Sequence, residues 1–371
     1  MIPVNKPLMG KEEINAVTKV LKTGVLTGRL GSGPMAKQFE DNFAKFAGTK
    51  HAIAVNSGTA ALHMALWARN IKAGDEVILP SFTFIATAEA VALVGAKPVF
   101  VDIKPETYNI DPRKIEPAVT SKTQAIMPVD LYGLPAEMDK AREIADKHNL
   151  LVVEDAAQAH GASYKGRPPG QFADIACWSF YASKNMTTGE GGMITTNDDE
   201  HAEKLRLLRS HGEKEEYKAA MLGHNYRMPE IEAAMGIEQL KKLPAFAEKR
   251  RKNAEILTEK LRDVKQLILP AEPKGCRSSW YLYTVRIRDG TVKDRDIVIQ
   301  SLRKKGVGAG VYYHTPIHLM PYYRQHENLV LPETEKAAEQ VFSLPVHPGL
   351  KATEVNYVAR AVRQIMRQQS S

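Results

Sequence analysis

Between residues 50 and about 200, short apolar runs alternate with stretches that have helical periodicity. Most of the runs lack polar alternation, which is typical of strands that are buried on both faces. Repeated strand–helix–strand units build a mostly parallel sheet that is covered by helices. We therefore predict an α/β fold in which a large domain has three α/β/α layers. The predicted strands are HAIAV (51–55), EVILP (76–80), KPVFVDI (97–103), QAIMPV (124–129), NLLVVEDA (149–156), DIACWSF (174–180) and GMITT (192–196).

The pattern changes after about residue 230. The stretch EIEAAMGIEQLKKL predicts a helix that ends at Pro244, and a long, charged, amphipathic helix follows it. Strand-like segments such as WYLYTVRI and GAGVYYHT then alternate with further helix patterns. We expect a large domain over residues 1–240 and a smaller C-terminal α+β domain over residues 241–371, with about the first 20 residues of the chain packing on the smaller domain.

Charge and cysteine content narrow the class of protein. Lys plus Arg is 51 and Asp plus Glu is 43, which gives a net charge of +8. The acids are interleaved with the bases, whereas a dedicated nucleic-acid-binding protein concentrates its basic residues in a patch or tail. The two cysteines, Cys177 and Cys276, are too few for a disulfide framework or a Cys-rich zinc module. No apolar stretch reaches the length of a membrane span and the N-terminus has no apolar signal region, so we expect a cytoplasmic protein.

In open parallel sheets, ligands bind beyond the carboxyl ends of the strands. After the first predicted strand, Ser57-Gly58-Thr59 opens an alanine-rich helix. Ser57 suits the N-cap position, and the N-terminus of a helix attracts an anion. The segment therefore indicates a phosphate site, although plain helix capping would also explain these three residues.

Two more strand ends carry residues with reactive or charged side chains. Asp155 follows a buried strand, where a carboxylate needs a partner to stay ionised; a cationic nitrogen of a ligand would serve, and so would solvent in a loop. Lys184 stands four residues beyond Phe180, at which another strand ends. A desolvated lysine there could form a Schiff base, although most lysines are simply solvated.

Taken together, these three features match the needs of pyridoxal phosphate. Its phosphate needs an anion site, its ring nitrogen needs a carboxylate to stay protonated, and its aldehyde needs a lysine. An aromatic side chain from PSFTFIAT (80–87) could lie on the face of the ring, and we favour Phe84 over Phe82.

The chain resembles the fold-type I, pyridoxal-phosphate-dependent sugar aminotransferases of the DegT/DnrJ/EryC1/StrS family over nearly its whole length. This resemblance implies pyridoxal phosphate as the cofactor, glutamate as the usual amino donor, and a nucleotide-linked ketosugar as the second substrate. The matching segments include LTGRLGSGPMAKQFE, VNSGTAALHMAL, EVILPSFTFIATAEAV, VEDAAQAHGASYKG, DIACWSFYASKN, GEGGM, GHNYRMPEIEAAMG and VYYHTPIHLMPYY.

The resemblance also implies roles for individual residues. Lys184 would bond to the cofactor and then move protons, and Asp155 would hold the ring nitrogen. Gln158 would approach the phenolic oxygen, and Phe84 would stack on the ring. The phosphate would be held by Gly58, Thr59 and Ser179, together with Asn225 of the partner subunit in a homodimer with composite sites. The sugar substrate would be contacted by Glu190, Tyr313 and His318.

Two positions discriminate between branches of this family. Some relatives have histidine where Lys184 stands and act as sugar dehydratases, so the lysine favours transamination. Glu190, within GEGGM, favours amination of carbon 4 of the sugar over carbon 3. A pyridoxal-phosphate-dependent sugar dehydratase and a cofactor-binding regulatory protein are the alternatives to an aminotransferase.

Three other patterns in the sequence have ordinary explanations. His314 and His318 have the spacing of helical zinc ligands, but Pro316 lies between them, so we expect no metal site. GVGAG (306–310) precedes a strand, whereas a dinucleotide-binding loop follows one. GRLGSG (28–33) is either a substrate loop, as the resemblance implies, or a flexible connection.

Overall fold

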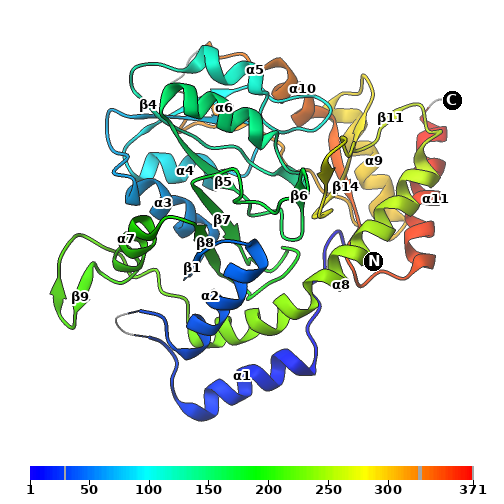
Figure 1. Ribbon diagram of the computed structural model, residues 1–371. Coiled ribbons are helices and arrows are strands. Elements are labelled where there is room, and N and C mark those ends of the chain that lie inside the picture. Colours follow the sequence, from blue (N-terminus) through cyan, green and yellow to red (C-terminus); the bar gives the residue numbers. More distant parts are fainter. Residues whose placement is uncertain (29–30, 325–327, 370–371) are drawn as a thin grey trace.

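A seven-stranded sheet forms the centre of the molecule in the computed structural model, which describes residues 1–28, 31–324 and 328–369 (Figure 1). Its strand order is β1-β8-β7-β5-β4-β2-β3, and only β8 runs antiparallel to its neighbours. The predicted, mostly parallel sheet is therefore confirmed. The strands are β1 (His51–Val55), β2 (Glu76–Pro80), β3 (Lys97–Val101), β4 (Thr123–Ile126), β5 (Leu151–Asp155), β7 (Ile175–Ser179) and β8 (Gly192–Thr196).

Helices cover both faces of this sheet and give the predicted three layers. On one face, α3, α4 and α7 pack against alternate strand residues in one apolar cluster. On the other face, α2 and the first half of α8 cover β1 and β7, while α5 and α6 cover β2, β4 and β5. The helices are α2 (Pro34–Ala47), α3 (Gly58–Ala68), α4 (Ala86–Leu93), α5 (Pro112–Ile115), α6 (Met138–His148), α7 (Asp199–Arg209) and α8 (Glu230–Leu261).

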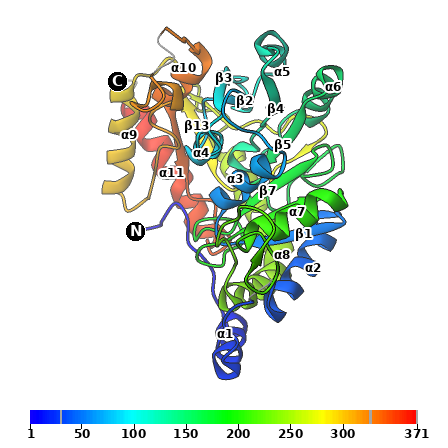
Figure 2. The same cartoon turned by 90° about the vertical axis from the view of Figure 1, so that its left-hand side faces the viewer.

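The C-terminal part has a small antiparallel sheet, and the apolar core around that sheet also includes residues of the large part, such as Phe82, Val129 and Tyr132. Strand β13 lies between β11 and β14, and helices α9, α10 and α11 pack around this sheet (Figure 2). The elements are β11 (Leu267–Ile268), β13 (Tyr283–Ile287), β14 (Val341–Leu344), α9 (Val292–Lys304), α10 (Pro332–Gln340) and α11 (Ala352–Gln368). Two short ladders complete the fold: β9 (Glu213–Glu215) with β10 (Lys218–Ala219), and β6 (Ser163–Tyr164) with β12 (Cys276–Arg277).

Helix α8 corrects one sequence prediction, because it continues through Pro244 and spans 32 residues. A proline inside a helix removes one backbone hydrogen bond and crowds the preceding turn. Here the first half of α8 packs on α1 (Lys11–Thr23) and α2, and its second half packs on α11, so tertiary packing outweighs the local cost. Although α8 is long, no described helix is apolar enough over a sufficient length to cross a membrane.

The first residues of the chain lie on the C-terminal part. Ile2 pairs with Val307, and the Gly308 amide donates to the Ile2 carbonyl at 2.7 Å. Helix α1 then lies at the outer end of the molecule against α8 in both views (Figures 1 and 2), where the Glu13 carboxylate accepts from Lys242 at 2.7 Å. The division into two domains near residue 240 stays a prediction, and that position falls inside α8.

Candidate active site

A cavity of about 450 Å³ opens where the carboxyl ends of β5 and β7 meet the N-terminus of α3. It also receives side chains from the segment after β2 and from the C-terminal part of the chain, so residues far apart in the sequence share one space. The predicted site residues that line it are Gly58, Thr59, Phe84, Asp155, Gln158, Ser179, Lys184, Glu190 and Tyr313.

The N-terminus of α3 forms one end of this cavity. The Ser57 hydroxyl caps the helix by accepting from the Ala60 amide at 3.0 Å. The first backbone N–H groups of a helix have no acceptor within the helix, and they carry the positive end of its dipole. The Ser179 side chain, on the last residue of β7, stands beside this turn. Together these groups suit a phosphate.

Gly58 allows the close approach between α3 and β7. A Cβ atom added at Gly58 would lie 2.8 Å from the Ser179 Cβ atom and 3.3 Å from its Cα atom. Because part of this contact is with backbone, the clash cannot be relieved by a rotamer change of Ser179.

We therefore expect Gly58→Ala to weaken cofactor binding by about tenfold or more, since overpacking of this kind costs about 1–3 kcal/mol. The dissociation constant for pyridoxal phosphate, measured by absorbance titration, checks this. Gly31→Ala is the control, because its Cβ atom would enter open space. Equal affinities of the two variants would contradict the assignment of α3 as the phosphate site.

Asp155 is the last residue of β5, and only 5% of it is exposed. Its carboxylate accepts from the Thr87 hydroxyl at 2.9 Å and from the Ala157 amide at 3.2 Å. Burial raises the pKa of Asp155, while the Thr87 hydroxyl, the Ala157 amide and the Lys184 charge oppose this rise. A cationic ligand nitrogen would give this buried carboxylate a charged hydrogen-bonding partner.

Lys184, Tyr281 and Phe84 line the same cavity. The Lys184 nitrogen lies 4.8 Å from the ring centroid of Tyr281. The choice between the two phenylalanines follows from exposure: Phe84 is 52% exposed and lines the cavity, whereas Phe82 is 1% exposed and packs in the core. The Phe84 ring is therefore the one available to a planar ligand.

Gln158 and Tyr313 meet across the cavity wall. The Gln158 amide nitrogen donates to the Tyr313 hydroxyl at 3.4 Å, and its amide oxygen accepts from the Tyr132 backbone at 2.7 Å. Glu190 lies at the rim near Glu232 of α8. Burial, together with the Glu190 charge, raises the pKa of Glu232 to about 7.

His318 lies outside the cavity, which differs from its predicted place. Its side chain is buried, and both ring nitrogens have partners: Nδ1 lies 2.7 Å from the Ser81 hydroxyl and Nε2 lies 3.2 Å from the Glu335 carboxylate. Residue spacing could not reveal this burial. This geometry assigns His318 to holding its loop against Ser81, and it gives no support to a sugar contact.

His314 is exposed. Among the residues that the structure describes, no three His, Cys, Asp or Glu side chains are grouped as metal ligands would be. In the GRLGSG segment, Arg29 and Leu30 lie outside the described residues.

Asn225 is exposed and does not line the cavity of its own chain. It pairs with Ser210, and the next residues run beside the end of β1, where the Asn56 amide donates to the Tyr226 carbonyl at 3.0 Å. A contact between Asn225 and a cofactor therefore stays a prediction that depends on a second subunit.

Sequence reasoning missed several residues of this site, of which three bear on its chemistry. Thr87 holds Asp155, while Ser183 and Tyr281 line the cavity next to Lys184. Thr87 and Ser183 lie in the segments PSFTFIAT (80–87) and DIACWSFYASKN, but no spacing rule singles out a hydroxyl that supports another side chain. Tyr281 lies in an apolar, aromatic segment that predicts a core strand, so its sequence gives no sign of a site residue.

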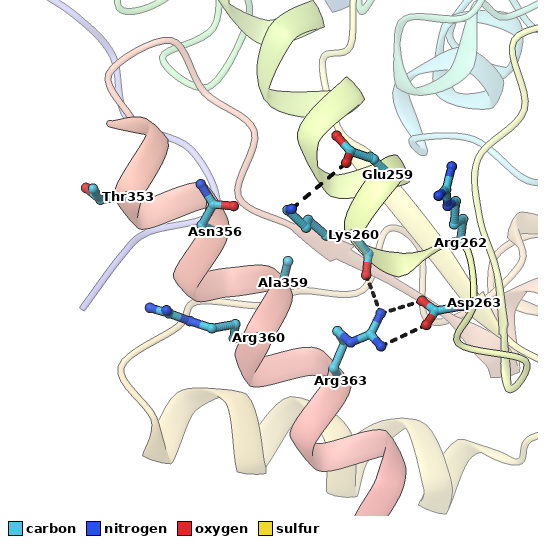
Figure 3. Close-up of a pocket in the computed structure, with 9 residues that line it drawn as sticks. All are labelled: Glu259, Lys260, Arg262, Asp263, Thr353, Asn356, Ala359, Arg360 and Arg363. Carbon is cyan, nitrogen blue, oxygen red and sulfur yellow. Dashed lines mark hydrogen bonds and ion pairs between the residues drawn. The ribbon is translucent and has the colours of Figure 1, made fainter.

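A larger cavity, of about 750 Å³, lies elsewhere, between the end of α8 and α11 (Figure 3). Arg363 donates to the Asp263 carboxylate at 2.8 Å and to the Lys260 carbonyl at 2.7 Å, whereas Arg360 points away from this pair (Figure 3). Exposed side chains of both charges line this cavity, and it shares no lining residue with the cavity at the strand ends. The cavity that holds Asp155 and Lys184 is therefore the candidate active site.

Comparison with known proteins identifies the family. The model of the DegT/DnrJ/EryC1/StrS aminotransferase family matches residues 7–363. The chain belongs to this family. It is 42% identical to GDP-perosamine synthase of Caulobacter vibrioides over 337 residues, which cover 90% of this chain and 91% of that protein. The predicted resemblance is confirmed, and the chain is an aminotransferase.

Solved structures agree with the fold. DesV of S. venezuelae, in complex with a ketimine intermediate, has a TM-score of 0.91 at 39% identity, with 96% of this chain and 94% of that chain covered. The PLP form of a putative sugar aminotransferase, Spr1654 of Streptococcus pneumoniae, has a TM-score of 0.94 at 28% identity, with 99% of each chain covered.

Members of this family depend on pyridoxal phosphate, and the cavity fits that cofactor. The helix N-terminus suits its phosphate, the buried Asp155 carboxylate suits its ring nitrogen, and the Lys184 amine lies within the same walls.

Proposed function

We propose that this enzyme moves an amino group from glutamate to a nucleotide-linked ketosugar and so makes an aminosugar for polysaccharide or glycan synthesis. The observation that carries this proposal is the meeting of Lys184, Asp155 and the α3 N-terminus in one cavity of an enzyme of this family. The family and the relative named as a GDP-perosamine synthase support a sugar substrate. The cytoplasmic location inferred from the sequence is part of the proposal.

Each residue of the cavity has a separate task in this reaction. Bound pyridoxal phosphate supplies an aldehyde for the amine and a ring that accepts electrons. Lys184 would hold that aldehyde and, as a free amine, would move a proton at the donor carbon. Asp155 would keep the ring nitrogen protonated, and Phe84 would offer its face to the ring. Gly58, Thr59 and Ser179 would hold the phosphate, and Gln158 would approach the phenolic oxygen.

The sugar would bind at the outer part of the cavity, where Glu190 and Tyr313 lie. We favour carbon 4 of the sugar over carbon 3, on the basis of Glu190. The sugar-nucleotide carries a negatively charged pyrophosphate, and part of the net charge of +8 would attract it to the site.

The first test of this proposal is the colour of the purified protein after loading with pyridoxal phosphate. The visible absorbance of the lysine-bound cofactor should disappear when glutamate is added and return when 2-oxoglutarate is added. An absorbance that does not respond to glutamate or to other amino acids would count against transamination.

We further propose a homodimer with composite sites. The hairpin of β9 and β10 and helix α1 both stand out from the body of the chain (Figure 1). Large apolar side chains on or near them are exposed, including Leu222 at 76% and Ile14 at 63%. Exposed apolar groups of this kind are typical of protein interfaces. Asn225 lies in the same region of sequence as Leu222, where it could reach the phosphate of a second subunit.

Mixing two inactive variants tests this composite site. Asn225→Ala lacks the residue that completes the site of the partner subunit, whereas Lys184→Ala lacks the residue that acts in the site of its own chain. A mixed dimer would contain one intact site, so we expect it to recover about half of the wild-type rate per dimer. Both parents alone should stay impaired. Mixed dimers that stay as inactive as the two parents would contradict the assignment of Asn225 across subunits.

A further inference from the structure

The free amine of Lys184 lies over an aromatic ring. Its nitrogen is 4.8 Å from the ring centroid of Tyr281, within the range in which an ammonium group is attracted to the face of a ring. Within the described part of the chain, no carboxylate forms an ion pair with this amine. The Tyr281 ring is therefore a direct stabilising contact of this amine, and the Asp155 charge also attracts it.

Tyr281 itself is held on two sides. Its hydroxyl shares a hydrogen bond of 2.8 Å with the hydroxyl of Ser183, the residue that precedes Lys184. Its backbone carbonyl accepts from the Arg250 guanidinium at 3.1 Å. Because Tyr281 is only 7% exposed, its ring has little freedom to move away from the lysine.

Arg250 connects these contacts to the N-terminal segment. Its second terminal nitrogen donates to the Asn5 side-chain oxygen at 3.1 Å, and the Asn5 amide donates to the Ser183 carbonyl. The contacts thus close a ring that runs from Arg250 through Asn5, Ser183 and Tyr281 back to Arg250. The N-terminal segment is in this way tied to the loop that carries the lysine.

The burial of Arg250 argues for a specific role. Arg250 is 1% exposed, and within the described residues no carboxylate pairs with it. Burial lowers the pKa of Arg250 to about 10. A buried cation without an acid partner is unfavourable. Its three neutral acceptors, in Asn5, Trp280 and Tyr281, lie around the lysine loop, so its charge serves to fix that loop.

We infer that Tyr281 is a positioning residue for the Lys184 amine, held in place by the ring of Arg250, Asn5 and Ser183. The inference rests on the proposed function. In a transamination the lysine must separate from the cofactor and yet stay close enough to move a proton. Its four-carbon stem is flexible, so the free amine needs a contact that restricts its position. The face of the Tyr281 ring provides this contact.

Comparison of Tyr281→Leu with Tyr281→Phe tests this inference, because the phenylalanine keeps the ring and loses only the hydroxyl. We expect Tyr281→Leu to slow the single-turnover reaction with glutamate by about tenfold with unchanged glutamate affinity, and Tyr281→Phe to stay within about threefold of wild type. Asn5→Ala keeps the Tyr281 side chain but frees the Ser183 carbonyl, and it should slow the reaction to an intermediate extent.

A second readout does not need turnover. A pH titration of the visible absorbance of the lysine-bound cofactor measures the pKa of the linking nitrogen. In Tyr281→Leu this pKa should fall by about half a unit to one unit, because the protonated form loses the ring face, whereas Tyr281→Phe should match wild type.

Wild-type values for Tyr281→Leu in both experiments would overturn the inference, and so would a Tyr281→Phe variant that is as impaired as Tyr281→Leu. A wrong proposed function would give a different result, because the wild-type protein itself would then not respond to glutamate. The titration would still report on Tyr281 in that case.

Discussion

Replacement of Lys184 by alanine is expected to lower the rate of amino transfer by at least about a thousandfold, because the enzyme then loses both its bond to the cofactor and its proton carrier. Pyridoxal phosphate should still bind through the α3 N-terminus and Asp155, but without the absorbance of the lysine-bound form. Steady-state kinetics and an absorbance spectrum measure both effects.

One further variant separates the chemistry of Lys184 from its charge, and a second is a control at another lysine. Lys184→Arg keeps a cation in the cavity but cannot bond to the aldehyde, so it should be as inactive as the alanine variant. Lys252→Ala removes an exposed lysine and should leave the rate unchanged. A small primary amine added to Lys184→Ala should restore part of the activity, since it can replace the proton carrier. A Lys184→Ala enzyme with near wild-type turnover would refute the site.

Replacement of Asp155 by asparagine is the second large effect that we expect. The amide has nearly the same shape, but it has no negative charge to keep the ring nitrogen of the cofactor protonated. Loss of one such electrostatic contact in a buried site lowers rates by about a hundredfold to a thousandfold. Because the phosphate site is intact, cofactor affinity should change much less than the rate constant for amino transfer.

The surroundings of Asp155 provide the controls. Thr87→Val removes one hydrogen bond to the carboxylate and should give a smaller loss, of about tenfold or less. Asp199→Asn removes an exposed carboxylate that pairs with Lys50 and should have no effect on the rate. If Asp155→Asn were as active as Asp199→Asn, the ring nitrogen would have to be held elsewhere.

The parts of the fold that rest on local pattern could be predicted from the sequence. The strands of the large sheet were found because both of their faces are buried, so apolar residues fill them without alternation. Asp155 and Lys184 were found for a related reason. Each follows a buried strand, and the topology of a parallel sheet brings such positions to one edge.

Features that depend on contacts between distant segments could not be predicted. Pro244 predicts a helix end, but packing along both halves of α8 carries the helix through it. His318 and Tyr313 lie in one sequence motif. Only the fold shows that the His318 ring is buried against Ser81, whereas the Tyr313 ring lines the cavity. Tyr281 meets Lys184 from a segment almost a hundred residues away.

The most direct measurement of the central claim is mass spectrometry of the reaction products. The loaded enzyme would be incubated with glutamate that carries heavy nitrogen in its amino group and with a panel of nucleotide-linked ketosugars, and Lys184→Ala would serve as the blank. We expect a nucleotide-linked aminosugar that contains the heavy nitrogen, with 2-oxoglutarate formed in equal amount. A dehydrated sugar without nitrogen, or no labelled aminosugar from any member of the panel, would contradict it.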